Sequence, residues 1–328
     1  MSKIDVAVLM GGISAERTVS LSTGRQILQS LDQDKYTPVG IDAAAIGRVP
    51  GSDAGDMAPF DLAALAEASG RPRPDVVFVA LHGRGGEDGS VQGLLELLGL
   101  RYTGSGILAS ALAMDKAAAK RVLRHEGVPV PDGLVLDNRS AANADDVDAA
   151  IVEALGYPVV VKPSREGSTF GCSIARSRDE LAAALDAAFA RDSVVLVEEF
   201  LPGMEITVGV LGNRTPEALP TLEIVPTSGF YDYEAKYAAG GSRHVIPARL
   251  PEETLAEAAE LACNCHQALG CRGMSRTDMI VSDRGLVVLE TNTIPGMTPT
   301  SLLPEAAQAA GIPFPDLLDR IIGLALED

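Results

Sequence analysis

Continuous apolar runs and amphipathic segments alternate along this chain, and the alternation predicts an α/β fold. Buried strands are expected where short apolar runs are bounded by turn residues, at Ile4–Met10, 75–81, 158–162, Val194–Glu199 and 205–211. The first three of these runs lead into glycine-containing loops. Helical periodicity predicts one helix that begins near residue 14 and another that ends near residue 98. It predicts further helices at 107–125, 144–155, 178–190, 252–269, 304–310 and 315–326.

Two runs rich in β-branched residues, 277–282 and 286–291, predict a β-hairpin near the C-terminus. They flank Asp283-Arg284-Gly285, in which Gly285 suits the left-handed position of a three-residue loop. Such a loop sets the register of the two strands. Because side chains alternate between the faces of a strand, one face is expected to cover a core with Met279, Val281 and Leu289.

The same register gathers four polar side chains on the other face of the hairpin. Asp278 is expected opposite Glu290, and Arg276 opposite Asn292. Facing carboxylates repel each other unless a cation lies between them, and Mg²⁺ takes oxygen ligands of this kind. Asp278, Glu290 and Asn292 are therefore a candidate magnesium site, with Arg276 beside them to meet an anion. A solvated polar face is the alternative, and the tail to Gly296, whose backbone can approach an anion, favours the metal site.

Two strand ends near the N-terminus carry further candidates for a binding site. Ser14 is a plausible N-cap after the first strand, and Glu16 then lies in the first helical turn, at the edge where open α/β folds bind ligands. A carboxylate there also suits the helix dipole without any function. His82 follows the strand at 75–81, although a lone histidine is more often structural. The loop Gly-Gly-Ile-Ser-Ala-Glu does not match the dinucleotide-binding pattern.

A lysine and a flexible loop follow the strand at 158–162. Lys162 ends the strand, and residues 167–171 offer backbone N–H groups and hydroxyls that suit phosphate oxygens. The lysine precedes the glycines, so the segment is not a Walker A loop, and a plain hairpin turn is the alternative.

A connector and a long loop complete the candidates. The connector at 198–201 can hold a purine beside an apolar wall, with Glu205 reaching ribose hydroxyls, or it can be an ordinary strand connection. Residues 228–244 show little periodicity and contain Lys236 and three tyrosines. Loops of this length inside compact domains are usually lids or binding loops.

Composition and charge narrow the class of protein. A chain of 328 residues with 46% hydrophobic residues suggests two or three folded domains. The formal net charge of −18 argues against nucleic acid and anionic membranes as partners. No apolar run approaches the length of a membrane span, and the N-terminus reads as a strand. The four cysteines lack paired zinc spacing and are expected to be free thiols in a reducing cytosol.

Seven segments in order resemble the D-alanine–D-alanine ligases of the ATP-grasp superfamily, over nearly the whole chain. They are GGISAERTVSL, ALHGRGGEDGSVQGLLELLG, YTGSG with MDK, VKPSREGS, FYDYEAKY, SRTD and ETNTIPGMTPTSL. The resemblance implies a three-domain ATP-grasp fold: a Rossmann-like parallel-sheet domain at 1–103, a central domain at 104–197 and a C-terminal domain at 198–328. It also implies a cytoplasmic homodimer.

The implied reaction joins two D-alanines into D-alanyl-D-alanine through an acyl phosphate, for peptidoglycan precursors. It uses ATP with Mg²⁺, or with Mn²⁺ in its place. The resemblance implies that the adenine lies at Glu198 to Leu201, the ribose at Glu205, and the phosphates at Lys116, Lys162 and Lys236. It implies magnesium ligands at Asp278, Glu290 and Asn292.

The remaining implied residues contact the amino-acid substrates. Glu16, Ser168 and Tyr237 match a hydrogen-bonded trio that positions the second D-alanine and the long loop. Arg276 and the Gly296 backbone match groups that face the reacting carbonyl oxygen. His82 and Ser301 match substrate-contacting positions.

The chain departs from the family pattern at two positions. Glu199 stands where many members carry a lysine, which puts a lysine contact to adenine in doubt. The glycine loop reads Gly-Ser-Thr-Phe-Gly, whereas Gly-Ser-Ser followed by an aliphatic residue and Gly is commoner in the family, so Phe170 stands in place of the aliphatic residue.

Two rival functions follow from the sequence. Within the family, D-lactate or D-serine can replace the second D-alanine, and His244 is the feature that bears on D-lactate, although a solvated loop residue is expected there. From another class, the chain can be a nucleotide-binding module without turnover. The complete set of acidic residues with Arg276 argues against that module.

Overall fold

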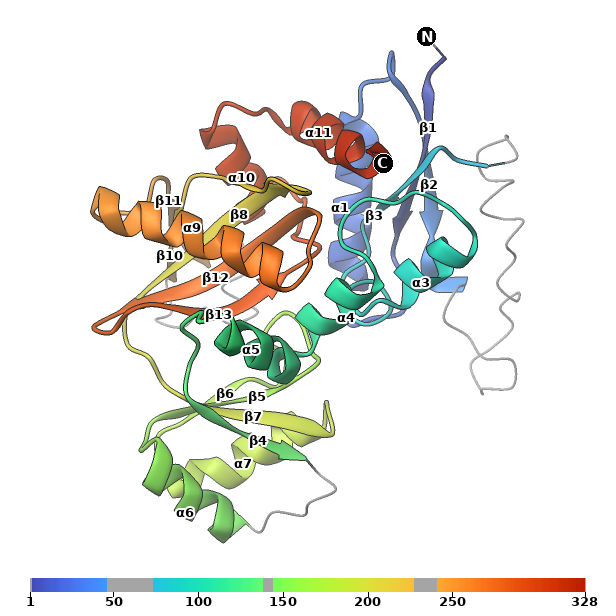
Figure 1. Cartoon of the computed structure of the whole chain (residues 1–328). Helices are drawn as coiled ribbons and strands as arrows, with labels where there is room; N and C mark the ends of the chain where they lie inside the picture. The colour runs from blue at the N-terminus through green and yellow to red at the C-terminus, as the bar shows by residue number, and fades with distance from the viewer. Residues whose placement is uncertain (1, 46–72, 138–143, 227–240, 328) are drawn as a thin grey trace.

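The computed structural model of the protein describes residues 2–45, 73–137, 144–226 and 241–327 (Figure 1). Within these residues the strands form a three-stranded, a four-stranded and a six-stranded sheet. The predicted α/β class is therefore confirmed.

The N-terminal sheet is parallel and has the strand order β2-β1-β3. Its elements are β1 (Ile4–Met10), α1 (Arg17–Ser30), β2 (Tyr36–Asp42), the 3₁₀ turn η1 (Ala43–Ala45), β3 (Val76–Val79) and α3 (Ser90–Leu97). Since β1 and β3 are adjacent and parallel, the loops after them leave the same edge of the sheet. This places Glu16 and His82 in neighbouring loops.

The central sheet is antiparallel and has the order β4-β7-β5-β6. Its elements are β4 (Gly133–Asp137), α6 (Ala144–Ala154), β5 (Val159–Pro163), β6 (Ser173–Ala175), α7 (Arg178–Phe189) and β7 (Val194–Glu199). Both helices lie on one face, at the bottom of Figure 1. Val159 and Val161 point into the core beneath them, so alternation turns Val160 and Lys162 to the opposite face.

The C-terminal sheet has the order β11-β10-β8-β12-β13, with β9 beside β8. Its strands are β8 (Met204–Gly212), β9 (Glu217–Ala218), β10 (Leu222–Pro226), β11 (Ser242–Val245), β12 (Gly273–Ser282) and β13 (Gly285–Asn292). The helices α4 (Ile107–Met114), α5 (Lys116–His125) and α9 (Glu252–Ala268) share an apolar core with this sheet.

The two ends of the chain share one core. Helix α10 (Leu302–Ala309) buries Leu303, and α11 (Phe314–Leu326) buries Leu317 and Ile321, in the same apolar cluster as Val8 and Phe78 of the N-terminal sheet. Strand β7 runs across the predicted boundary between 197 and 198. The division into 1–103, 104–197 and 198–328 stays a prediction.

Two predicted helix boundaries are wrong. Helix α1 begins at Arg17, so Ser14 is not its N-cap. The Ser14 hydroxyl donates a hydrogen bond to the backbone carbonyl of His82 at 2.7 Å. The single helix predicted at 107–125 breaks at Asp115, which is extended. The Asp115 carboxylate accepts a hydrogen bond from Ala118 N at 3.1 Å and so caps α5. The apolar periodicity continues through this break, so the sequence pattern did not predict it.

The hairpin β12–β13 has the predicted register where the polar residues lie. Asp278 pairs with Glu290 and Arg276 with Asn292. The predicted three-residue loop is wrong, because Ser282 pairs with Gly285 and leaves a two-residue turn. A β-bulge between Asp278 and Met279 on one side and Glu290 and Val288 on the other absorbs the difference.

The bulge also decides which side of the hairpin Leu289 faces. Met279 is fully buried in the core, as predicted. Leu289 is the extra residue of the bulge and lines a cavity on the polar side, so the prediction that it covers the core is wrong. A period-two pattern cannot show where a bulge shifts it by one.

Candidate active site

Two cavities of about 480 and 510 Å³ lie between the sheets. The first is bounded by the loops after β1 and β3, the end of β13 and residues 296–302. The second lies between the central and C-terminal sheets. Lys116, Ser168 and Glu290 line both, so the two spaces meet at these three side chains. We name them the first cavity and the second cavity.

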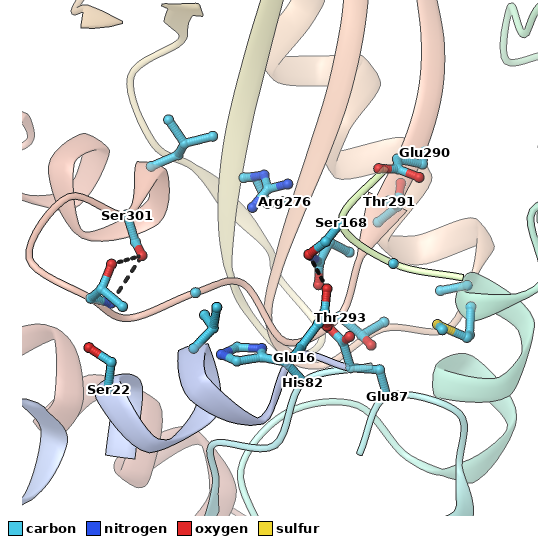
Figure 2. A pocket seen from close by; sticks show the side chains of 18 of the residues that line it. Glu16, Ser22, His82, Glu87, Ser168, Arg276, Glu290, Thr291, Thr293 and Ser301 are labelled. Carbon is cyan, nitrogen blue, oxygen red and sulfur yellow. Dashed lines mark hydrogen bonds between the residues drawn. The ribbon is translucent and has the colours of Figure 1, made fainter. Parts of the chain in front are cut away.

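Every predicted site residue that the structure describes lines at least one of these cavities. Besides the three shared residues, the first cavity contains Asn292 and Gly296. It also contains Glu16, His82, Arg276 and Ser301, which are labelled in Figure 2. The second contains Lys162, Glu198, Leu201, Glu205 and Asp278. Lys236 and Tyr237 lie outside the described residues.

Glu16 and Ser168 meet although 152 residues separate them in the chain, and the Ser168 hydroxyl donates to Glu16 Oε1. Two glycines allow this approach. A Cβ atom on Gly83 or on Gly167 would lie 3.0 Å from a Glu16 carboxylate oxygen. Ser168 itself has a φ of 50°, an uncommon conformation that turns its side chain toward Glu16. Figure 2 shows this bond across the first cavity.

His82 is held as a neutral ring on the wall of the first cavity. Its Nε2 lies 3.1 Å from Thr23 Oγ1 on α1, and the residue is buried. Burial lowers the pKa of His82 to about 4, because the charged imidazolium loses its hydration. At neutral pH the ring therefore offers a hydrogen bond and no charge.

The facing carboxylates of the hairpin are each paired with a cation. Arg276 donates two hydrogen bonds to Asp278, at 2.9 and 2.7 Å. Lys116 Nζ lies 3.1 Å from Glu290 Oε2. The prediction left Arg276 beside the carboxylates to meet an anion, whereas the structure joins it to Asp278. The two cations relieve the repulsion that opposed carboxylates would otherwise produce.

The donor set of the hairpin fits a magnesium ion. Asp278 and Glu290 present carboxylate oxygens from paired positions, and Asn292 adds an amide oxygen one alternation further along β13. Such oxygens are the ligands that Mg²⁺ prefers, with phosphates completing its shell. In the described part of the chain no group of three His, Cys, Asp or Glu side chains could hold a metal, so the set relies on the amide. The four cysteines are free, as predicted.

Lys116 is positioned by a clasp that the sequence analysis missed. Its Nζ donates to Glu166 O at 2.8 Å. The preceding Asp115 accepts a hydrogen bond from the buried Ser164 hydroxyl at 2.7 Å, and Ser164 Oγ accepts from Ala117 N at 3.1 Å. The clasp ties the start of α5 to the loop after β5. An aspartate before a helical lysine was the available signal, but its partner comes from another sheet.

Glu198 also differs from its expected surroundings. The resemblance implied that it holds adenine, yet its buried carboxylate is shared by two lysines, Lys162 at 2.7 Å and Lys120. Lys120 was not predicted as a site residue, because a lysine on an alanine-rich helix gives no sign of burial. The apolar wall predicted beside the purine is present, since Phe200 and Leu201 line the second cavity.

Glu87 is a second missed residue, on the wall of the first cavity. Its carboxylate accepts a hydrogen bond from Gly83 N at 2.6 Å. Burial, with the nearby Glu16 carboxylate, raises the pKa of Glu87 well above its usual value. Glu87 follows His82 in the sequence HGRGGED, and that spacing was the only available signal.

Three residues that the sequence analysis questioned have defined partners. Glu199 accepts hydrogen bonds from Asp132 N at 2.8 Å and from the Arg284 guanidinium. Phe170 lies under Arg191, 5.7 Å from the ring centre to the guanidinium carbon. His244 lies in β11, with Nδ1 2.7 Å from Glu305 Oε2, and its side chain is largely buried. The expectation of a solvated loop residue at His244 is therefore wrong.

A parallel α/β sheet, followed by two antiparallel sheets that enclose a cavity lined with lysines and carboxylates, defines an ATP-grasp enzyme. Comparisons with known proteins give the family. Residues 5–105 match the family described as D-ala D-ala ligase N-terminus, and residues 122–323 match D-ala D-ala ligase C-terminus. The chain belongs to the D-alanine–D-alanine ligase family.

Individual relatives agree with this assignment. The chain is 49% identical to the D-alanine–D-alanine ligase of Syntrophobacter fumaroxidans, over 99% of each chain. It is 46% identical to that of Pelotomaculum thermopropionicum, over 99% of this chain and 98% of the other.

Solved structures of the family have the same fold. The Bacillus anthracis D-alanine–D-alanine ligase complexed with ATP has a TM-score of 0.80 at 35% identity, over 98% of this chain and 97% of that one. The VanG D-Ala:D-Ser ligase of Enterococcus faecalis has a TM-score of 0.82 at 33% identity, over 99% of this chain and 100% of that one.

Proposed function

We propose that the protein joins two D-alanines into D-alanyl-D-alanine with ATP, through an acyl phosphate, for peptidoglycan precursor synthesis. The observation that carries the proposal is the meeting of the two cavities at Lys116, Ser168 and Glu290. Phosphoryl transfer from a nucleotide to an amino acid needs two binding spaces that share one wall. The full-length similarity to D-alanine–D-alanine ligases supports the choice of substrates.

The second cavity holds ATP in this proposal. The purine lies against Phe200 and Leu201, and Glu205 on β8 bonds the ribose. Lys116 and Lys162, which both line this cavity, contact the phosphates, and Lys236 reaches the γ-phosphate. Phosphoryl transfer depends mainly on positioning and on neutralising charge, and these side chains do both.

Asp278, Glu290 and Asn292 hold Mg²⁺ in this proposal, or Mn²⁺ in its place. The ion neutralises charge on the phosphates during transfer. If Asp278 bound the metal ion, Arg276 would be released from its two hydrogen bonds with that carboxylate and could face the substrate. Lys116 is released from Glu290 in the same way and can meet a phosphate. The present ion pairs thus keep the four side chains close to their working positions.

The first cavity holds the two amino acids. The carboxylate of the first D-alanine takes the phosphoryl group, and the amine of the second then attacks the carbonyl carbon. Arg276 and the Gly296 N–H stabilise the tetrahedral oxyanion, and groups of this kind contribute ~3–4 kcal/mol each. Glu16, with Ser168 and Tyr237, positions the second D-alanine, while His82 and Ser301 contact the substrates.

The test is phosphate release with D-alanine, ATP and Mg²⁺, together with detection of the dipeptide. The structural likeness to a D-Ala:D-Ser ligase makes D-serine the acceptor to compare, and D-lactate is the third. Supplying D-alanine with each competitor at neutral pH should give mainly D-alanyl-D-alanine. Mainly D-alanyl-D-serine would move the protein to the other acceptor class, and nucleotide binding without any ligated product would leave only a binding module.

A cytoplasmic homodimer completes the proposal. Helices α3 and α4 pack against each other and carry three large apolar side chains that are exposed, Leu97, Ile107 and Leu108. Exposed apolar side chains on adjacent helices suit an isologous interface. No helix in the described residues is both long and apolar enough for a membrane span. Sedimentation equilibrium should give a dimer, and replacing Leu97 and Leu108 by lysine should give monomers. A monomer for the unmodified protein would contradict this part.

A further inference from the structure

Three charged side chains are buried together behind the second cavity. Lys120 lies on α5, Lys162 on β5 and Glu198 on β7. One Glu198 oxygen accepts a hydrogen bond from Lys120, and the other accepts from Lys162 at 2.7 Å. Their side chains are only 7%, 13% and 4% exposed, in that order. Burying three charges costs desolvation free energy unless each is paired with an opposite charge, so a functional reason for the arrangement is expected.

Only two members of this triad reach the cavity. Lys162 and Glu198 line it, whereas Lys120 is absent from the lining that the described residues form. Lys120 therefore cannot contact a ligand in that cavity directly. Any effect of Lys120 on a ligand there is therefore electrostatic, or passes through its hydrogen-bond partner Glu198.

The balance of charge gives Lys120 such an effect. If Glu198 were paired with Lys162 alone, the pair would be neutral, and the attraction of Lys162 for an anion would be largely cancelled by the adjacent carboxylate. Lys120 adds a second positive charge on the far side of the same carboxylate. The triad then has a net charge of +1, and Lys162 presents that charge to the cavity. The third charged group that acts on Lys120 is Glu290 of β13.

Protonation follows the same geometry. Burial, with repulsion from Lys162, lowers the pKa of Lys120 to about 7 against the attraction of Glu198. Glu198 itself has a lowered pKa, because the two lysines outweigh its burial. As pH rises through neutrality, the triad loses its first proton from Lys120, the more deeply buried lysine.

We propose that Lys120 is a positioning residue, which holds and neutralises Glu198 so that Lys162 presents its full charge to the phosphates of the nucleotide. The inference rests on the proposed function, because it requires a polyphosphate in the second cavity. It assigns Glu198 an electrostatic and structural part rather than a direct contact with the purine. A buried lysine outside the cavity thereby sets the affinity for the ligand inside it.

The experiment measures binding of MgADP by calorimetry to the full-length protein. At pH 6, where Lys120 is protonated, Lys120→Met should weaken binding at least tenfold, whereas Lys120→Arg, which keeps the charge, should bind within about threefold of the unmodified protein. Arg121→Met is the matched control. It removes the same charge from the next, exposed position of α5 and should leave binding unchanged. Equal binding by Lys120→Met and the unmodified protein would overturn the proposal.

A double variant separates electrostatics from packing. Lys120→Met with Glu198→Gln removes one charge of each sign and leaves Lys162 with a net charge of +1. It should bind MgADP more tightly than Lys120→Met alone. If the two substitutions instead weaken binding additively, Lys120 has only a packing role and the proposal is wrong.

The pH profile adds a readout that packing does not move. The affinity of the unmodified protein for MgADP should fall, relative to that of Lys120→Arg, as pH rises from 6 to about 8.5, because arginine stays charged. A constant ratio of the two affinities would contradict the proposal. Should Lys120→Met fail to fold, this profile still decides the matter.

Turnover distinguishes this inference from the function on which it rests. An unmodified protein that binds MgADP with the predicted pH profile but forms no dipeptide would overturn the proposed function alone. Active unmodified protein, together with unchanged MgADP binding by Lys120→Met, would overturn the inference alone.

Discussion

The two cavities differ in how the fold builds them and in how their charges are balanced. The second cavity lies between two antiparallel sheets, and its deepest charge, Glu198, is neutralised by two lysines. The first cavity gathers loops from distant parts of the chain, and its wall holds the carboxylates of Glu16 and Glu87 in addition to that of the shared Glu290. In Figure 2 both point into the same space as His82, which is neutral.

This difference has a chemical sense. A polyphosphate needs net positive charge, and the buried triad supplies it. An amino acid carries an ammonium group, which a carboxylate such as Glu16 can meet. In the proposed function, the triad therefore places positive charge beside the nucleotide, Glu16 places negative charge beside the amino acids, and the shared residues stand where the reacting groups meet. Substitutions should affect one cavity, the other, or both, according to the wall on which they lie.

Glu290→Gln should have the largest effect, because Glu290 belongs to both cavities. It removes a metal ligand and one partner of Lys116, and ligation should fall about a thousandfold or more, the size expected when charge stabilisation of a transition state is lost. The fold should persist, because the change also removes repulsion from Asp278. Phosphate release and thermal unfolding measure the two effects. Glu180→Gln, on the exposed surface of α7, is the control. Near-normal turnover at saturating Mg²⁺ would exclude Glu290 as a ligand.

Protonation of buried histidines should weaken the fold in acid. His266 is buried in the C-terminal core, and burial lowers its pKa to about 4 from an ordinary 6.5. The unfolded chain therefore takes up this proton first as pH falls below 6.5, so the stabilising contribution of the neutral ring is lost between pH 6.5 and 4. The loss from pH 7 to pH 5 should be about 2 kcal/mol for this residue.

Urea unfolding of His266→Gln at pH 7 and at pH 5 checks this expectation. The variant should lose less free energy of unfolding between the two pH values than the unmodified protein. Equal losses would show that His266 does not titrate differently in the folded and unfolded states. His82→Gln provides the counterpart on the wall of the first cavity and should reduce the loss in the same direction.

Gly167→Ala should affect the first cavity and spare the second. The new Cβ would lie 3.0 Å from Glu16 Oε1, so the carboxylate must move by a few tenths of an ångström. We expect the KM for the acceptor D-alanine to rise about tenfold, roughly 1.4 kcal/mol, with little change in MgADP affinity. Gly323→Ala, where a Cβ meets nothing within 4 Å, is the matched control. A comparable loss of MgADP affinity in Gly167→Ala would mean that the two cavities are not separable in this way.

Ser164→Ala should have the smallest effect, and it acts on Lys116, one of the three residues that line both cavities. It removes the hydroxyl that joins Asp115 to Ala117 N, and the loss should be about 1 kcal/mol of stability. Because the clasp sets the start of α5, turnover should decline with both KM values moderately raised. Thermal unfolding and steady-state kinetics measure the two effects. Unchanged kinetics would show that Lys116 keeps its position without the clasp.

The candidate site was largely predictable where a motif lies in one segment or one hairpin. Asp278 and Glu290 face each other as predicted, because the pairing depends on residues only twelve positions apart. The predicted loop length was nevertheless wrong. The turn is one residue shorter than predicted, and the β-bulge restores the pairing of Asp278 with Glu290. Leu289 shows the consequence, because a single inserted residue moved it from the core to a cavity.

Contacts between distant segments were beyond the reach of sequence patterns. The bond between Ser168 and Glu16, the pairing of His244 with Glu305 and the clasp between Ser164 and Asp115 each join separate elements. The resemblance to a family implied the first of these, and local pattern alone implied none. Lys120 and Glu87 were missed because burial, which makes a charged side chain informative, is a property of the packed molecule.

The sequence by itself determined most of the helices, the strands β1, β3, β5, β7, β8, β12 and β13, the polar face of the hairpin and the family to which the chain belongs. These depend on side-chain periodicity, turn chemistry and motif spacing, which act over short stretches of chain. Only the tertiary structure decided which charges are buried together, how two lysines share Glu198, and where the two cavities join. Those features depend on the packing of three sheets, because electrostatic energy is set by distance and burial in space rather than by separation along the chain.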